Sequence, residues 1–114
     1  MPVARDLKLY QGNQEIFTVT VTKDDDGLPQ NLTGLVVNVY LKAARETADL
    51  DASTVKLSTS TGEIVLTTPL SGLCTVTVPA SALATAGRRW WRCDVIIGGQ
   101  AKTAAFGPLL VVDT

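Results

Sequence analysis

Strict alternation of apolar and polar residues is the feature of this sequence that most limits its fold. Four segments share this alternation: residues 15–22, 35–42, 74–79 and 90–97. In the first of them, Phe17, Val19 and Val21 alternate with threonines. Successive side chains of a β-strand point to opposite faces, so a period of two places each apolar set on one face of a sheet. The four segments are therefore predicted strands with one buried face.

Shorter segments complete the predicted set of strands: residues 5–10, 54–58, 63–68 and a last strand that is broken near Gly107-Pro108 and ends at Val112. Gly98-Gly99 predicts a two-residue hairpin, because glycine reaches positive φ at little cost. Residues 79–87 are predicted to form one short helical turn, and 43–52 a polar excursion or short helix. Seven to nine short strands with regular turns indicate an all-β fold, an antiparallel immunoglobulin-like β-sandwich, and we expect one domain spanning 1–114.

Histidine is absent from all 114 residues, which limits the chemistry open to the chain. Nucleophile activation of the Ser-His-Asp or Cys-His type is excluded, and the commonest zinc ligand is missing. The carboxylates, lysines and tyrosines form no recognisable catalytic constellation. We therefore expect a protein that is not an enzyme and that needs no cofactor.

Charge and hydropathy limit the partners of the chain. A net charge of −1 gives no overall attraction to nucleic acid or to an anionic membrane surface, so neither is an expected partner. No apolar run approaches the roughly 20 residues of a membrane span. The N-terminal sequence MPVARDLKLY lacks the apolar segment of a signal peptide, so we expect synthesis in the cytoplasm.

Three consecutive carboxylates, Asp24 to Asp26, open the stretch DDDGLPQNLTG (24–34), which can be read as a calcium loop or as the tip of a β-hairpin. A calcium loop of the EF-hand type needs oxygen ligands at alternate positions and a distal glutamate. Here the carboxylates are contiguous, and no glutamate follows at that distance. Gly27 and Pro29 are typical turn residues. We interpret the stretch as a solvated turn that binds no metal.

The two cysteines, Cys74 and Cys93, lie on strands that the turn at 79–87 is expected to make neighbours. This placement allows a cross-strand disulfide. Buried free thiols are the favoured interpretation, because disulfides are rare in proteins made in the cytoplasm.

The motif RRWWR (88–92) is the strongest local anomaly. Trp90 and Trp91 must face opposite ways on a strand, and Trp91 shares its face with apolar residues, so it belongs to the predicted core. That core has seven members: Phe17, Val19, Val37, Val39, Val76, Trp91 and Val95. Trp90 shares its face with charged residues, and Arg89 and Arg92 flank it. This composition is typical of a protein-interface hot spot, although packing against arginine stems, or stacking on sugar or nucleic acid, would also use it.

The last strand offers a second candidate contact. Leu109, Leu110, Val111 and Val112 carry no charge to protect a sheet edge. Exposed strand edges pair readily with other chains, and soluble proteins usually blunt them. We therefore predict that these four residues are a protein-contact strand.

The order of the motifs resembles the small immunoglobulin-like β domains of tailed-bacteriophage virion proteins, such as the N-terminal domain of the phage upper baseplate protein. The motifs are QGN (11–13), DGLPQNLTG (26–34), WRCDVII (91–97) and a closing hairpin strand. Members of that group typically carry Gln-Gly-Asp at the first motif and an aspartate at the second, where this chain has Asn13 and Asn31.

This resemblance implies a structural component of a phage particle that is present in several copies in the virion and docks to other virion proteins. The tail, baseplate or fibre-attachment region is the first expectation, and capsid decoration is the alternative. A carbohydrate-binding module that uses Trp90, Tyr40 and the acidic loop is a rival of another class. Only 5% of the residues are aromatic, which offers little for it.

Overall fold

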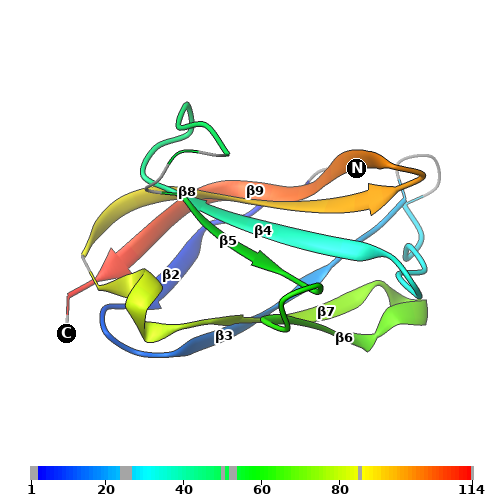
Figure 1. Cartoon of the computed structure of the whole chain (residues 1–114), viewed down its shortest axis with the longest axis horizontal. Helices are drawn as coiled ribbons and strands as arrows, with labels where there is room; N and C mark the ends of the chain where they lie inside the picture. Colours follow the sequence, from blue (N-terminus) through cyan, green and yellow to red (C-terminus); the bar gives the residue numbers. More distant parts are fainter. Residues whose placement is uncertain (1–2, 24–26, 50, 52–53, 85, 114) are drawn as a thin grey trace.

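The computed structural model of the chain describes residues 3–23, 27–49, 51, 54–84 and 86–113. Strands and short 3-10 helices are its regular elements (Figure 1). The strands are β1 Val3–Ala4, β2 Leu7–Tyr10, β3 Glu15–Thr20, β4 Val36–Lys42, β5 Val55–Ser58, β6 Ile64–Thr68, β7 Leu73–Val78, β8 Gly87–Ile97 and β9 Gln100–Val112. The 3-10 helices are η1 Pro69–Ser71 and η2 Ala80–Leu83.

The strands form two sheets that face each other, with β8, β9, β4 and β5 in one layer of Figure 1 and β3, β7 and β6 in the other. The larger sheet, sheet A, has the order β1-β9-β8-β4-β5, and β2 also pairs with β9. The smaller sheet, sheet B, has the order β3-β7-β6. The predicted immunoglobulin-like β-sandwich is confirmed. One detail differs, because β1 and β2 run parallel to β9 in an otherwise antiparallel arrangement.

The last strand is not broken at Gly107-Pro108 as expected, because β9 continues through both residues. Proline lacks the backbone N–H that donates to the next strand of a sheet. It is therefore tolerated only where the neighbouring strand needs no hydrogen bond from that position. The gap between β1 and β2 lies at this point, since β1 ends opposite Phe106 and β2 begins opposite Leu109. Gly107 and Pro108 therefore interrupt no pairing with the N-terminal strands.

Helical structure is confined to short 3-10 turns in the described part of the chain. The turn predicted at 79–87 is η2, and η1 was not predicted. Residues 43–49 form bends and turns without a helix, so the polar excursion is the correct alternative for the described part of 43–52. The two-residue hairpin is confirmed, with Ile97 paired to Gln100 and both intervening glycines at positive φ.

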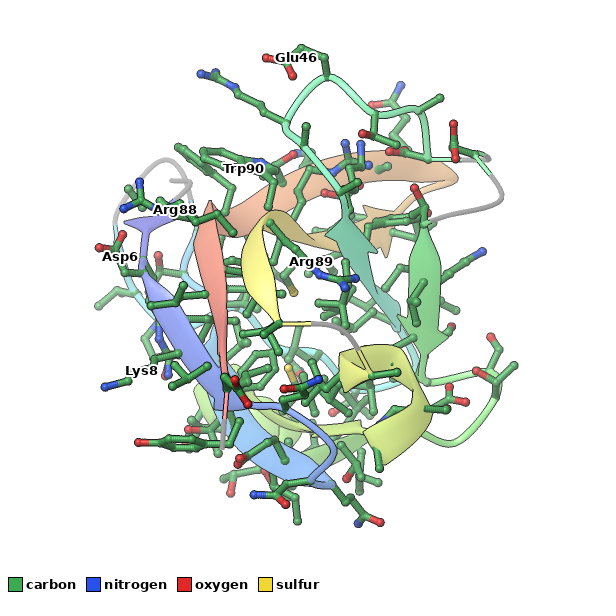
Figure 2. All side chains as sticks on the ribbon, turned by 90° about the vertical axis from the view of Figure 1, so that its left-hand side faces the viewer. Asp6, Lys8, Glu46, Arg88, Arg89 and Trp90 are labelled. Atoms are coloured by element: carbon green, nitrogen blue, oxygen red, sulfur yellow. The ribbon has the colours of Figure 1, made fainter. Side chains whose placement is uncertain are left out.

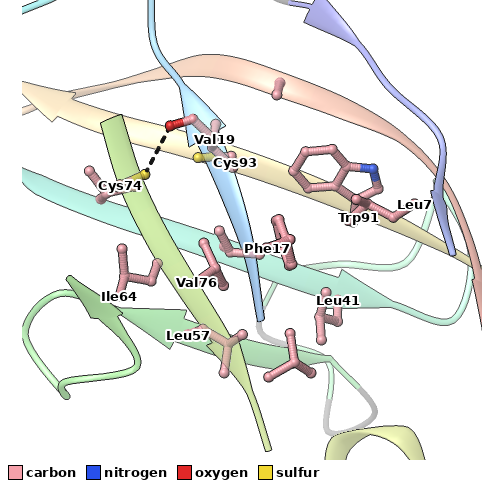
Figure 3. Close-up of a cluster of buried hydrophobic side chains, with 14 of the residues drawn as sticks. Leu7, Phe17, Val19, Leu41, Leu57, Ile64, Cys74, Val76, Trp91 and Cys93 are labelled. Atoms are coloured by element: carbon pink, nitrogen blue, oxygen red, sulfur yellow. Dashed lines mark hydrogen bonds between the residues drawn. The ribbon is translucent and has the colours of Figure 1, made fainter. Parts of the chain in front are cut away.

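All seven predicted core residues are buried between the sheets. The ring of Trp91 meets that of Phe17 edge-to-face, with 5.7 Å between centroids (Figure 3). Trp90, the residue before Trp91, is only half-buried and lies on the opposite side of β8. The register predicted for this strand is therefore confirmed.

The N-terminal segment runs close beside β9 between β1 and β2. The backbone N–H of Arg5 donates to the Phe106 carbonyl at 2.9 Å, and the Trp91 indole Nε1 donates to the Arg5 carbonyl at 2.8 Å. A Cβ on Gly107 would lie 2.2 Å from that same Arg5 oxygen. Only glycine fits here, because no side chain can share the space with the Arg5 backbone.

The two cysteines are free and buried, as predicted. They do not lie on neighbouring strands, however, because Cys74 is on β7 of sheet B and Cys93 on β8 of sheet A (Figure 3). The Cys74 thiol donates to the Val19 carbonyl, with 3.7 Å between sulfur and oxygen. Burial raises the pKa of Cys74 to about 11 and also raises that of Cys93, so both are protonated at neutral pH.

Candidate protein interface

The outer face of sheet A carries a continuous strip of aromatic and aliphatic side chains. Alternation along three adjacent strands turns these residues away from the core. We call them the aromatic strip: Tyr10 from β2, Phe106, Pro108, Leu110 and Val112 from β9, and Trp90 from β8. The registers bring them together, since Trp90 pairs with Pro108 and Tyr10 with Val112.

Trp90 is half-buried within the strip and contacts an aromatic ring and a cation. Its ring centroid lies 6.0 Å from that of Phe106, with an interplanar angle of 32°. The guanidinium carbon of Arg45 lies 5.3 Å from the centre of the Trp90 ring. An arginine over a tryptophan face is a cation–π contact worth about 0.5–1 kcal/mol at an exposed site. Trp90 is thus held in one orientation, yet part of it still reaches solvent.

Arg45 reaches Trp90 from the loop that follows β4, and an ion-pair network holds this loop against the sheet. In Figure 1 the loop rises from the outer side of sheet A, and in Figure 2 Glu46 lies at its tip. Asp49 accepts from Lys42 Nζ and from an Arg92 Nη atom, each at 2.5 Å. The hydrogen bonds from Arg92 and then Lys42 lower the pKa of Asp49. Lys42 is itself buried, and Asp49 is the partner that its charge requires.

Arg92 makes several contacts within the molecule. Its Nε donates to both carboxylate oxygens of Asp94, at 3.0 Å and 3.1 Å, and Thr103 Oγ1 donates to the same carboxylate. Its guanidinium carbon lies 4.9 Å from the Tyr40 ring centroid. Arg92 therefore anchors the loop within the molecule, and its predicted role as an interface residue stays a prediction.

The C-terminal strand is not the free edge that was expected. Leu109 to Val112 pair with Leu7 to Tyr10 on one side and with Gly87 to Arg89 on the other. The N-terminal strand thus covers the edge that lacks charge. Leu109 and Val111 are 1% exposed and belong to the core, whereas Leu110 is 42% exposed and Val112 is half-buried, both on the outer face.

Arg88 and Arg89 lie on different sides of β8. Figure 2 shows Arg88 and Trp90 on one side and Arg89 on the other. Arg89 follows the alternation of Trp91 and is half-buried, so it is not part of the aromatic strip. Lys8 and Arg88 flank Leu110 from its two neighbouring strands and give this end of the strip a cationic border. The predicted role of Arg89 in a protein contact stays a prediction.

Three strip residues were not predicted as contact residues from the sequence: Tyr10, Phe106 and Pro108. Phe106 and Pro108 share the parity of the predicted Leu110 along β9, a signal that was available once the strand was taken as unbroken. Arg45 and Asp49 carried no such signal, because nothing in a polar loop shows which side chains fold back on the sheet.

The described residues give little indication of a metal site, a membrane span or a sugar-binding site. No group of three or more His, Cys, Asp or Glu side chains able to hold a metal ion occurs among them, while Asp24 to Asp26 lie outside the described part of the chain. No helix in that part is long and apolar enough to cross a membrane. One ring face each of Trp90 and Tyr40 lies against an arginine, so the two residues do not form the flat open row that a sugar ligand would stack on.

Neither a protein-family model nor a curated protein matches the sequence. Among 20 matching chains of known structure is the N-terminal domain of phage TP901-1 ORF48. It is 17% identical in sequence, has a TM-score of 0.62, and the match covers 97% of this chain and 89% of that one. At this identity the likeness concerns the fold. The resemblance inferred from the sequence is confirmed at that level: over nearly its whole length, the chain has the fold of this phage protein domain.

Proposed function

We propose that the chain is a non-enzymatic structural domain of a tailed-bacteriophage particle and docks to other virion proteins through the aromatic strip. The fold shared with the TP901-1 ORF48 domain supports a role in a phage particle. The absence of histidine supports a role without nucleophilic catalysis of the triad type. Within the particle, we place it in the tail, baseplate or fibre-attachment region, in several copies related by symmetry.

The observation that carries the docking surface is the state of Trp90. A tryptophan on the outer face of a sheet, half-buried and in contact with Phe106 and Arg45, is preorganised for contact. Little side-chain entropy is left to lose on binding, which lowers the cost of association. Tryptophans at the centre of an interface commonly contribute about 2 kcal/mol or more.

The surroundings of the strip indicate the chemistry of its partner. The strip itself is apolar, and Lys8, Arg45 and Arg88 lie along its border. An interface usually has an apolar centre and a polar rim whose charges complement the partner. We therefore expect a virion protein that offers an apolar patch bordered by carboxylates.

The test compares folding with assembly for Trp90→Ala. The variant is supplied in trans to phage lacking the gene, and its copy number in purified particles is measured by quantitative mass spectrometry. A contact worth about 2 kcal/mol corresponds to a roughly 30-fold weaker Kd, so we expect a clear loss of occupancy. Leu70→Ala is the matched control, since Leu70 is an exposed apolar residue of η1, outside the strip.

Thermal melts followed by circular dichroism separate folding from docking. If Trp90→Ala does not fold, Leu110→Asp probes the same strip from a more exposed position. Parental occupancy of both folded variants would place the docking surface elsewhere. Incorporation into tail-less heads would favour the capsid-decoration alternative over a position in the tail.

A further inference from the structure

The outer face of sheet B has a composition unlike that of sheet A. We call it the threonine face and define it by eight outward side chains: Ile16, Thr18 and Thr20 from β3, Leu73, Thr75 and Thr77 from β7, and Val65 and Thr67 from β6. None of the eight is ionisable. The Thr75 hydroxyl donates to that of Thr67 at 3.3 Å, so the two strands are also tied by their side chains.

Two of the most exposed apolar side chains of the molecule lie on this face. Ile16 is 60% exposed and Val65 is 55% exposed, at the two outer strands of the sheet. Exposed sheets of soluble proteins normally carry charged residues among their outward positions. An uncharged sheet face that exposes large apolar residues is a candidate interaction surface.

Charge matching limits what can cover the threonine face. Against the outer face of sheet A it would bury the exposed side chains of Lys8, Lys56 and Arg88 under a surface without charged partners, and desolvation of these groups is costly. Against a second threonine face no ionisable group among the eight residues is buried. Of the outer faces of the two sheets, only the threonine face of a second copy can therefore cover this surface without burying charged groups.

We propose that a second copy of the chain docks here, with the two threonine faces packed against each other about a twofold axis. A twofold contact uses the same patch on both copies, which suits a surface without like charges to repel each other. Sheets pack face to face about 10 Å apart, and threonine and valine suit such packing, because their branched side chains lose little rotamer freedom.

The area of the threonine face limits the affinity of this contact. Three strands of about five residues cover roughly 14 Å by 17 Å. This footprint is well below the roughly 800 Å² per partner of a stable complex, so a dilute solution should contain monomers. Copies held side by side in a symmetric particle would reach effective concentrations in the millimolar range, where a weak contact forms.

The experiment uses purified, isotope-labelled chain and needs no phage particle. Correlation NMR spectra and diffusion rates are recorded from about 20 µM to about 1 mM, a range suited to a weak complex. We expect amide shifts of the threonine face to grow with concentration, and diffusion to slow toward that of a species with twice the 12.1 kDa chain mass.

Two lysine variants make the test specific. Val65→Lys places like charges on both faces and should abolish the concentration dependence. Leu110→Lys adds the same charge at an exposed position of the aromatic strip and should leave it intact. Mixing Val65→Lys with Val65→Glu should restore association, because the two faces then carry opposite charges. Melting curves check that each variant folds.

Three results would overturn the proposal. The first is diffusion of a monomer up to about 1 mM, the upper limit for a contact of this kind. The second is shifts confined to the backbone of β6, which would indicate pairing between strand edges. The third is association that survives Val65→Lys and disappears in Leu110→Lys, which would assign it to the aromatic strip. Because Trp90 is not involved, either proposal can fail without the other.

Discussion

Replacing Gly107 by alanine tests the close approach of the N-terminal segment to β9. The added Cβ would lie 2.2 Å from the Arg5 oxygen and 2.9 Å from its carbonyl carbon. Backbone atoms, unlike the end of a flexible side chain, cannot move aside alone, so the whole segment between β1 and β2 must lift away. The change therefore acts on hydrogen bonds that the glycine itself does not make.

Two hydrogen bonds depend on the position of Arg5. Its carbonyl accepts from the buried Trp91 indole, and its N–H donates to Phe106. A buried donor left without an acceptor costs about 1–3 kcal/mol, and a backbone hydrogen bond contributes about 0.5–1.5 kcal/mol. Alanine also restricts the unfolded chain, which returns about 0.4–1 kcal/mol. We expect Gly107→Ala to lower the free energy of unfolding by about 2–3 kcal/mol.

Urea denaturation of four proteins measures this: the parent, Gly107→Ala, Trp91→Phe and the double variant. Trp91→Phe removes the same indole N–H, so the two changes share one hydrogen bond. Their costs should be sub-additive by about 1 kcal/mol or more. A Gly107→Ala protein within about 0.5 kcal/mol of the parent, or fully additive costs, would refute the role given to the contact between Arg5 and Gly107.

Two further predictions follow from ionisable groups. Asp49→Asn should lower the melting temperature at neutral pH, because Asp49 neutralises Lys42 and Arg92. The folded pKa of Asp49 is depressed, so its contribution is complete above its ordinary pKa of 3.8 and is lost as the pH falls below it. Melting curves of variant and parent should therefore converge in acid, and a constant difference at every pH would contradict this. Cys74 and Cys93 should resist iodoacetamide in the folded protein and react only on unfolding; fast labelling of the native state would show that they are accessible. Because burial raises the pKa of Cys74 from 9.0 to about 11, the stability from its protonated thiol is complete below pH 9.0 and declines as the pH rises through about 11.

The direction in which the side chains of each strand face follows from the sequence alone. Trp91 points into the core and Trp90 out of it, because alternation is a local property of an extended backbone. The Gly98-Gly99 hairpin was equally predictable, since a two-residue turn needs positive φ at adjacent positions. Both features depend only on residues close together in the chain.

Which strands are neighbours depends on contacts between distant parts of the chain. The sequence predicts that the C-terminal strand is a sheet edge. However, β2 from the opposite end of the chain pairs with it and leaves only its outer face exposed. Cys74 and Cys93 belong to different sheets, although a short connection separates their strands. Asp49 reaches the sheet because its loop folds back onto Lys42 and Arg92. The physical reason is that any strand offers the same N–H and C=O groups for pairing, so its partner is selected by the packing of the whole core.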